Sequence, residues 1–208
     1  MKIYLPILLG VSLLSACSMP QQVYQDSATE FINLTSDYIQ QCTKVSGMND
    51  PLEETLIFNT RDCFQMKNGI LKVVWDDQFV RAYVSKTDKR TTSIQVYNVM
   101  YTRQNRWIYP RSANFLVDGE LKIVDGVSIS SDVDCAFSDT YGSCLYTNHY
   151  AFDLPKDIFS EAKRLKSVGE TQFLYRIKTK AGGDFDRVLN VEEIIGLELK
   201  MKAVFSGL

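Results

Sequence analysis

The spacing of apolar residues changes along the chain, from a helical period near the start to a strand period in the middle. Between residues 27 and 47, apolar side chains recur at intervals of three and four, which predicts a helix with one apolar stripe. Ser27 and Glu30 have the spacing of a capping box at its start, and Gly47 is suited to end it. The predicted stripe consists of Phe31, Leu34, Tyr38, Cys42 and Val45.

From about residue 54 onward, apolar and polar residues alternate with a period of two, which predicts β-strands. Asp118-Gly119 and Gly182-Gly183 are hairpin signals, the first joining strands 107–117 and 120–130 and the second joining 171–180 and 184–189. The strand over 92–101 is apolar on both faces, which is typical of a central strand. Further strands are predicted over 56–58, 70–75, 79–84 and 144–154, with a turn at 76–77.

Two further segments have helical features. Residues 155–167 place Pro155 at the first position of a predicted helix and carry apolar residues at helical spacing. In 190–205, Asn190 followed by two glutamates is typical of a helix start, whereas strict alternation from Ile195 onward indicates a strand.

These elements predict a mainly β (α+β) fold. We expect an antiparallel sandwich or a barrel-like meander of about eight strands, with an N-terminal helix and one or two further helices packed on it. Because strands do not alternate with helices, a Rossmann or TIM-barrel arrangement is disfavoured.

The first sixteen residues have the features of an export signal. Lys2 precedes an uncharged, mostly apolar run from Ile3 to Leu14, shorter than the roughly 20 residues of a transmembrane helix. The run ends in Leu14-Ser15-Ala16-Cys17, which resembles the lipobox of bacterial lipoproteins. The resemblance implies diacylglycerol on the Cys17 thiol, cleavage before Cys17 by signal peptidase II, and acylation of the new amino terminus. An ordinary cleaved signal and a retained membrane helix are the alternatives.

The resemblance also implies an organisation and a location. Residues 1–16 are then the signal peptide, 17–25 a lipidated tether, and 26–208 a single globular periplasmic domain. In this class of proteins, Ser18 after the lipidated cysteine favours the outer membrane over the inner membrane. A protein attached through several acyl chains stays on its membrane, because one chain alone binds only reversibly.

The remaining cysteines, Cys42, Cys63, Cys135 and Cys144, are even in number, which indicates disulfides in an exported protein. Four cysteines allow three pairings. We favour Cys42–Cys63 and Cys135–Cys144, because both close local segments. Free thiols, a redox pair and a zinc site are weaker alternatives, since C-x-x-C is absent and Cys135, Cys144 and His149 do not have a common zinc spacing.

Charge and motifs narrow the possible functions. The formal net charge of -2 lacks the basic excess of a nucleic-acid-binding protein. His149 is the only histidine, and strand parity places it on a more solvated face, opposite Tyr146 and Tyr150. No nucleophile-elbow, zinc-protease or phosphate-loop motif is present, and no cofactor or metal is predicted. The acidic cluster Asp132, Asp134 and Asp139 suggests calcium only weakly, because it lacks the order of an EF-hand loop.

Aromatic residues offer one candidate binding surface. Tyr97, Tyr101, Trp107 and Tyr109 lie in neighbouring predicted strands, where they form either part of the core or an exposed binding face. We therefore expect a non-catalytic, lipid-anchored binding or envelope-assembly module whose partners are the membrane, through Cys17, and an envelope protein or glycan. The alternative is a cell-envelope hydrolase acting on peptidoglycan or another glycan, marked by convergent carboxylates or a perturbed His149 pKa.

Overall fold

The computed structural model describes residues 34–63, 77–102, 107–135, 144–180 and 183–206. The predicted leader (1–16), the predicted tether (17–25) and the predicted strand over 70–75 lie outside these residues. So do Ser27, Glu30 and Phe31 at the start of the first predicted helix.

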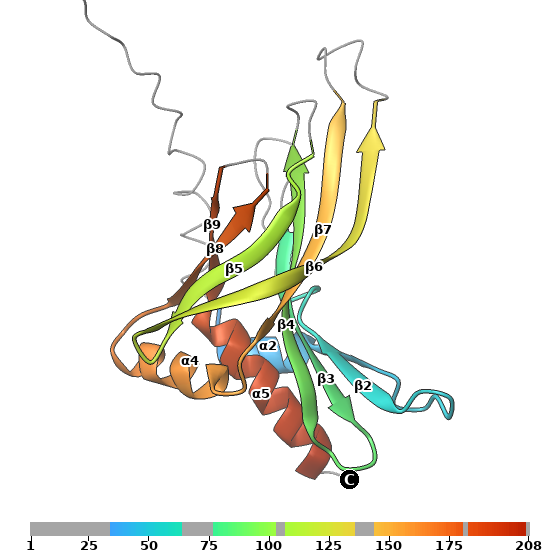
Figure 1. The fold of residues 1–208 in the computed structure, drawn as a ribbon. Coiled ribbons are helices and arrows are strands. Elements are labelled where there is room, and N and C mark those ends of the chain that lie inside the picture. Colours follow the sequence, from blue (N-terminus) through green and yellow to red (C-terminus); the bar gives the residue numbers. More distant parts are fainter. Residues whose placement is uncertain (1–33, 64–76, 103–106, 136–143, 181–182, 207–208) are drawn as a thin grey trace, which may run out of the picture.

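Within the described residues, nine antiparallel strands form one curled sheet, a half-barrel (Figure 1). Their order across the sheet is β1-β2-β3-β4-β7-β6-β5-β8-β9. The mainly β prediction is confirmed, but in the form of a single curled sheet; the two-layered sandwich is not confirmed. The strands are β1 (Lys44–Ser46), β2 (Thr55–Asn59), β3 (Asp77–Ser85), β4 (Thr91–Thr102), β5 (Pro110–Val117), β6 (Glu120–Asp134), β7 (Leu145–Leu154), β8 (Gln172–Thr179) and β9 (Phe185–Asn190).

The turn chemistry read from the sequence explains two of the hairpins. Asp118 and Gly119 have φ angles of 52° and 77°, the left-handed backbone that a two-residue turn between β5 and β6 requires. β8 and β9 pair on either side of Gly183, whose φ is 94°. The predicted turn at 76–77 is wrong at Asp77, which begins β3.

β6 changes partner halfway along its length. Residues 120–125 pair with β5, whereas residues 126–134 pair with β7, with a bulge between Ser128 and Ser130. In Figure 1, β6 leaves β5 and continues upward beside β7. Gly126 lies at the crossover, where a Cβ atom would overlap the ring of Tyr150. Glycine is therefore required at this position, because β6 passes directly over the Tyr150 ring.

The first described helix, α2 (Ser36–Cys42), is shorter than predicted. Its N-cap is Thr35, its buried residue is Ile39, and Tyr38 of the predicted stripe is 49% exposed. Val45, also assigned to the stripe, lies in β1, because residues 44–46 pair with β2. Strand pairing therefore ends the helix before Gly47, whose φ of 83° serves the turn after β1 instead.

The last segment is one helix, α5 (Val191–Ser206), so the strand reading of its alternating residues is wrong. Asn190 accepts a hydrogen bond from the Glu192 amide through its side chain at 2.8 Å, as a helix start requires. The alternation has another cause: α5 lies within the curl of the sheet and is apolar on several sides. Ile194, Ile195, Leu197 and Met201 are all less than 8% exposed.

Two other helices pack on α5. A Cβ atom at Gly196 would lie 2.5 Å from the Cβ of Ile39, so this glycine permits the close approach of α2. α4 (Ile158–Ser167) begins after Asp157. The prediction that Pro155 is the first residue of this helix is therefore wrong, because Pro155 lies before it. The buried Glu161 accepts two hydrogen bonds from Arg164 and one from the Asp118 amide, which attaches α4 to the β5–β6 turn.

Hydrogen bonds between buried polar side chains stabilise the curl of the sheet. The Tyr175 hydroxyl on β8 lies 2.9 Å from Oε1 of Gln78 on β3 and 2.6 Å from Oδ1 of Asn98 on β4. The Gln78 amide also donates a hydrogen bond to the carbonyl of Val188 on β9. These bonds join β3 and β4 to β8 and β9 across the apolar core, where an unpaired polar group is unfavourable.

Two disulfides have the predicted pairing. Cys42–Cys63 joins the end of α2 to the segment after β2, and Cys135–Cys144 joins the end of β6 to the start of β7. Closing loops of this size stabilises a folded protein by about 3 kcal/mol in the chain-entropy model.

The contribution of the Tyr175 hydrogen bonds to stability is tested by Tyr175→Phe, which removes only the hydroxyl. We expect the free energy of unfolding to fall by about 1–3 kcal/mol, because Gln78 and Asn98 lose a buried partner. Urea unfolding measures the change. Tyr83→Phe is the control, since the Tyr83 hydroxyl makes no hydrogen bond among the described residues. Equal stability of the two variants would show that the Tyr175 hydroxyl does not stabilise the curled sheet.

Candidate functional site on the outer face of the sheet

The sheet carries a small second cluster on its outer face, the face turned away from α5. This outer aromatic cluster consists of Phe79, Tyr97, Val99 and Ala151, with Tyr101 packed against it. Strand register brings its members together, because Phe79 pairs with Tyr97 and Tyr97 pairs with Ala151. The rings of Phe79 and Tyr97 stack with their centroids 4.9 Å apart.

The four aromatic residues singled out from the sequence are divided between different surroundings. Tyr97 and Tyr101 belong to the outer aromatic cluster. Trp107 instead contacts the ring of Tyr146 edge-on, with centroids 4.9 Å apart. Tyr109 is 56% exposed, with a φ angle of 50°. A binding role for these residues stays a prediction.

Two arginines cover the outer aromatic cluster. The Cζ atom of Arg81 lies 4.8 Å from the ring centroid of Phe79 and 4.3 Å from that of Tyr97. The Cζ atom of Arg61 lies 5.7 Å from the Phe79 centroid. All three distances lie within the range of cation–π attraction, so the rings hold the guanidinium groups on this face.

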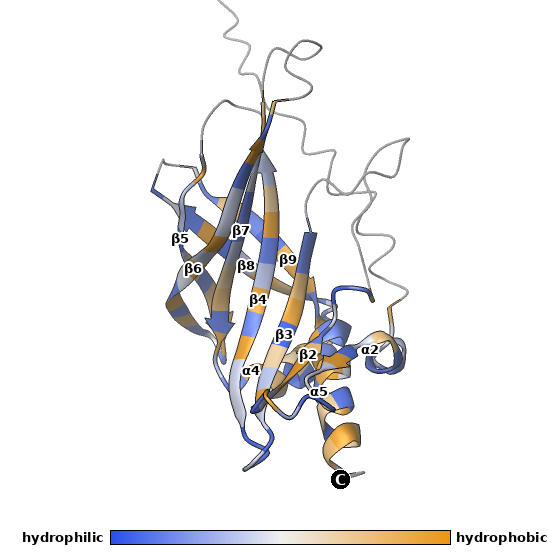
Figure 2. Ribbon diagram, turned by 90° about the vertical axis from the view of Figure 1, so that its right-hand side faces the viewer, coloured by the Kyte–Doolittle hydropathy of each residue, from blue (hydrophilic) through white to orange (hydrophobic). Residues whose placement is uncertain are grey.

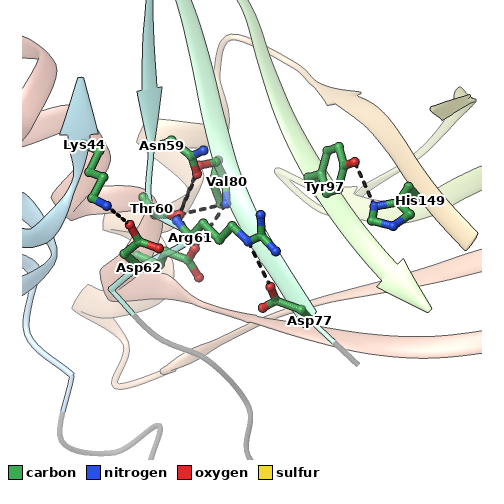
Figure 3. Close-up of polar contacts among 10 residues, drawn as sticks. Lys44, Asn59, Thr60, Arg61, Asp62, Asp77, Val80, Tyr97 and His149 are labelled. Carbon is green, nitrogen blue, oxygen red and sulfur yellow. Dashed lines mark hydrogen bonds and ion pairs between the residues drawn. The ribbon is translucent and has the colours of Figure 1, made fainter. Parts of the chain in front are cut away.

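Asp77 is the acidic residue beside these arginines. Its Oδ2 lies 3.6 Å from Nε of Arg61, while its buried Oδ1 has no hydrogen-bond partner (Figure 3). Burial raises the pKa of the Asp77 carboxyl, and the charge of Arg61 opposes this shift only in part. The pair is therefore a loose one, in contrast to the forked Arg164–Glu161 pair on α4.

His149 lies on the outer face, as strand parity predicts, but it is partly buried and has a specific partner. Its Nδ1 is 3.0 Å from the hydroxyl of Tyr97 (Figure 3). Burial lowers the pKa of His149, and the positive charge of Arg61 lowers it further, while Asp132 acts in the opposite direction. A perturbed His149 pKa was a mark of the hydrolase alternative. Here the imidazole is hydrogen-bonded to a phenol and not to a carboxylate or a nucleophile among the described residues.

A buried carboxyl group, Glu193, lies beneath β3 at the start of α5. The Thr60 hydroxyl donates to its Oε1 at 2.5 Å, and the Val80 amide donates to the same oxygen at 3.1 Å. The side chain is 4% exposed, and burial raises its pKa to about 7, with a further contribution from the nearby charge of Asp77. The sequence indicated Glu193 only as part of a helix start; its burial depends on where α5 meets β2 and β3.

The outer face also bears exposed aliphatic side chains on β5, β6 and β8. Leu116 on β5 pairs with Leu121 on β6. Phe115 pairs with Tyr175 on the inner face, so the next residues, Leu116 and Leu174, are neighbours on the outer face. Val127 pairs with Ala151, which joins these residues to the outer aromatic cluster. We call Leu116, Leu121, Ile123, Val127 and Leu174 the apolar outer patch; their exposed fractions lie between 56% and 65%. Figure 2 shows hydrophobic positions alternating with hydrophilic ones along these strands.

Metal ligands do not gather in the part of the chain that the structure describes: no three His, Cys, Asp or Glu side chains there are placed to hold an ion. Cys135 and Cys144 are bonded to each other, so the zinc alternative lacks its thiolates. Asp132 and Asp134 lie on β6, and Asp139 lies outside the described residues.

No protein-family model, curated protein or solved structure matches the chain. Among the described residues, no helix has the length and apolar character needed to cross a membrane.

The buried Glu193 predicts a pH-dependent stability. Its pKa is raised above that of an unfolded glutamate, so its contribution is fully present below about pH 4.5 and is lost as the pH rises through about 7. In Glu193→Gln this loss is absent, and the unfolding free energy at pH 8 should exceed that of the natural protein by a few kcal/mol.

Urea unfolding at pH 5 and pH 8 measures the difference, with Glu170→Gln at an exposed position as control. If the pH dependence of Glu193→Gln and of the natural protein were the same, Glu193 would not be the titrating group.

Proposed function

We propose that this protein is a lipid-anchored lipoprotein on the periplasmic side of the outer membrane, acting as a non-catalytic binding or envelope-assembly module. The lipobox Leu14-Ser15-Ala16-Cys17 supports the anchor. The pairing of the four remaining cysteines in two disulfides supports an oxidising compartment outside the cytoplasm. The membrane contact is then made through Cys17, and the second partner is an envelope protein or glycan.

The apolar outer patch is the observation that carries the binding role. Soluble monomers rarely expose contiguous aliphatic side chains in this number, and larger patches of this kind mark interaction sites. Five aliphatic side chains on three adjacent strands each expose more than half of their surface. Covering them would contribute roughly 5 kcal/mol to binding from apolar burial, before the entropy of association is subtracted. We therefore place the contact surface for an envelope partner on β5, β6 and β8.

The anchor is tested by Cys17→Ser. Without the thiol no diacylglycerol is attached, so we expect an uncleaved or mislocalised protein that incorporates no radioactive palmitate. Metabolic labelling and membrane fractionation measure both properties, with Thr87→Ala at an exposed position as a control that keeps the lipobox and both disulfides intact. Palmitate labelling and outer-membrane location of the Cys17→Ser protein would contradict the proposal.

The contact surface is tested by placing the photo-crosslinking residue p-benzoylphenylalanine at Leu121, Ile123 or Leu174 of the full chain in living cells. We expect discrete crosslinked products at these positions and none at Thr87, an exposed position in the β3–β4 turn. Immunoblotting of envelope fractions shows the products. If lipidated, membrane-bound protein gave no product at any of the three positions, the patch would not be a contact surface.

A further inference from the structure

Arg81 lies in an environment different from that of Arg164 and Arg176. Arg164 and Arg176 each direct two nitrogen atoms at one carboxylate, that of Glu161 and that of Asp186. Arg81 makes no hydrogen bond and no ion pair among the described residues, and its buried Nε has no partner. The buried Nε–H donor is unfavourable without an acceptor, and a ligand that contacts the guanidinium can supply one.

The rings beneath Arg81 fix where its donors are presented. The guanidinium lies against both Phe79 and Tyr97, which are 0% and 9% exposed. Stacking on aromatic rings is a common way to orient an arginine for a planar, forked contact with an oxyanion. Arg81 is therefore held in one position before any ligand arrives, so little conformational entropy is lost on binding.

Two further nitrogen-bearing side chains face the same cluster. Arg61 lies over the Phe79 ring, and its Nε is 3.6 Å from Asp77, too far for a hydrogen bond. His149 contacts Tyr97 edge-on, with ring centroids 5.8 Å apart. When the Tyr97 hydroxyl donates to Nδ1, the proton of the neutral imidazole is on Nε2, which becomes a further donor.

We propose that Arg81, Arg61 and His149 form a binding site for a phosphate group on the outer face of β3, β4 and β7. Arg81 provides the forked contact, Arg61 a second positive charge, and His149 an N–H donor. Donors on three side chains suit the several oxygens of a phosphate better than the two oxygens of a carboxylate. Asp77 and Asp132 are the negative charges that act on this set, through Arg61 and His149, and neither contacts Arg81. The site lies over the outer aromatic cluster, next to the apolar outer patch, and does not depend on the proposed function.

The single histidine makes the site directly observable. In the full-length protein, labelled with ¹³C-histidine and held in dodecyl maltoside micelles, His149 gives the one imidazole ε1 resonance. We expect a saturable shift of this resonance with inorganic phosphate, and none with sodium chloride at the same ionic strength. Bound phosphate should also raise the pKa of His149, because a nearby anion favours the imidazolium. In a second arm, phosphatidylglycerol is added to the micelles; a saturable response there without one to inorganic phosphate identifies a lipid headgroup as the source.

Variants distinguish this site from a general effect of salt. Arg81→Gln should weaken the response by about ten-fold or more, because it loses the charged donors, whereas Arg176→Gln should leave it unchanged. If Arg81→Gln loses the near-ultraviolet circular dichroism of the native fold, Arg81→Lys replaces it; it keeps the charge without the fork and should also bind more weakly. The proposal is overturned by the absence of a saturable response in both arms, or by an unchanged affinity in the folded Arg81 variant.

Discussion

The hydroxyl of Tyr175 is the contact on which the shape of the sheet depends. It joins β8 to Gln78 on β3 and to Asn98 on β4, while Gln78 also reaches the backbone of β9. An antiparallel sheet twists, but twist alone does not bring β3 and β4 opposite β8 and β9. Burying a polar group without a partner is unfavourable, so these bonds favour the curled arrangement in which the three side chains meet.

The curl gives the two faces of the sheet different roles. The inner face is filled by α5 and by aromatic side chains such as Phe115, Phe152 and Phe173. The helices of the described structure pack on this inner side, so they leave the outer face of β5, β6 and β8 uncovered. Arg61, Arg81, His149 and the exposed aliphatic residues therefore gather on one side, which is the basis of both proposals.

Local signals in the sequence predicted most of the strands, and long-range packing accounts for the errors. The Asp118-Gly119 hairpin, the strand over 92–101 and both disulfides depend on residues close in sequence, and all of them are confirmed. α2 ends where β1 pairs with β2, and residues 191–206 form a helix because they pack inside the curled sheet. Both contacts are with segments distant in sequence, so no local pattern predicts them. The outer aromatic cluster was missed for the same reason. Phe79, Tyr97 and Ala151 come from three strands, and only their register makes them neighbours.

The edges of the sheet indicate how a partner can approach. β1 has three residues and β9 has six, so neither offers a long edge for an added strand. The longer edge is on β6, where residues 126–134 pair only with β7 among the described strands. That edge carries a bulge, and the Asp132 carboxylate accepts a hydrogen bond from the Val133 amide, both of which hinder pairing with another strand. A partner is therefore expected to bind through side chains on the outer face, where Ile123 and Leu174 are exposed, rather than by extending the sheet.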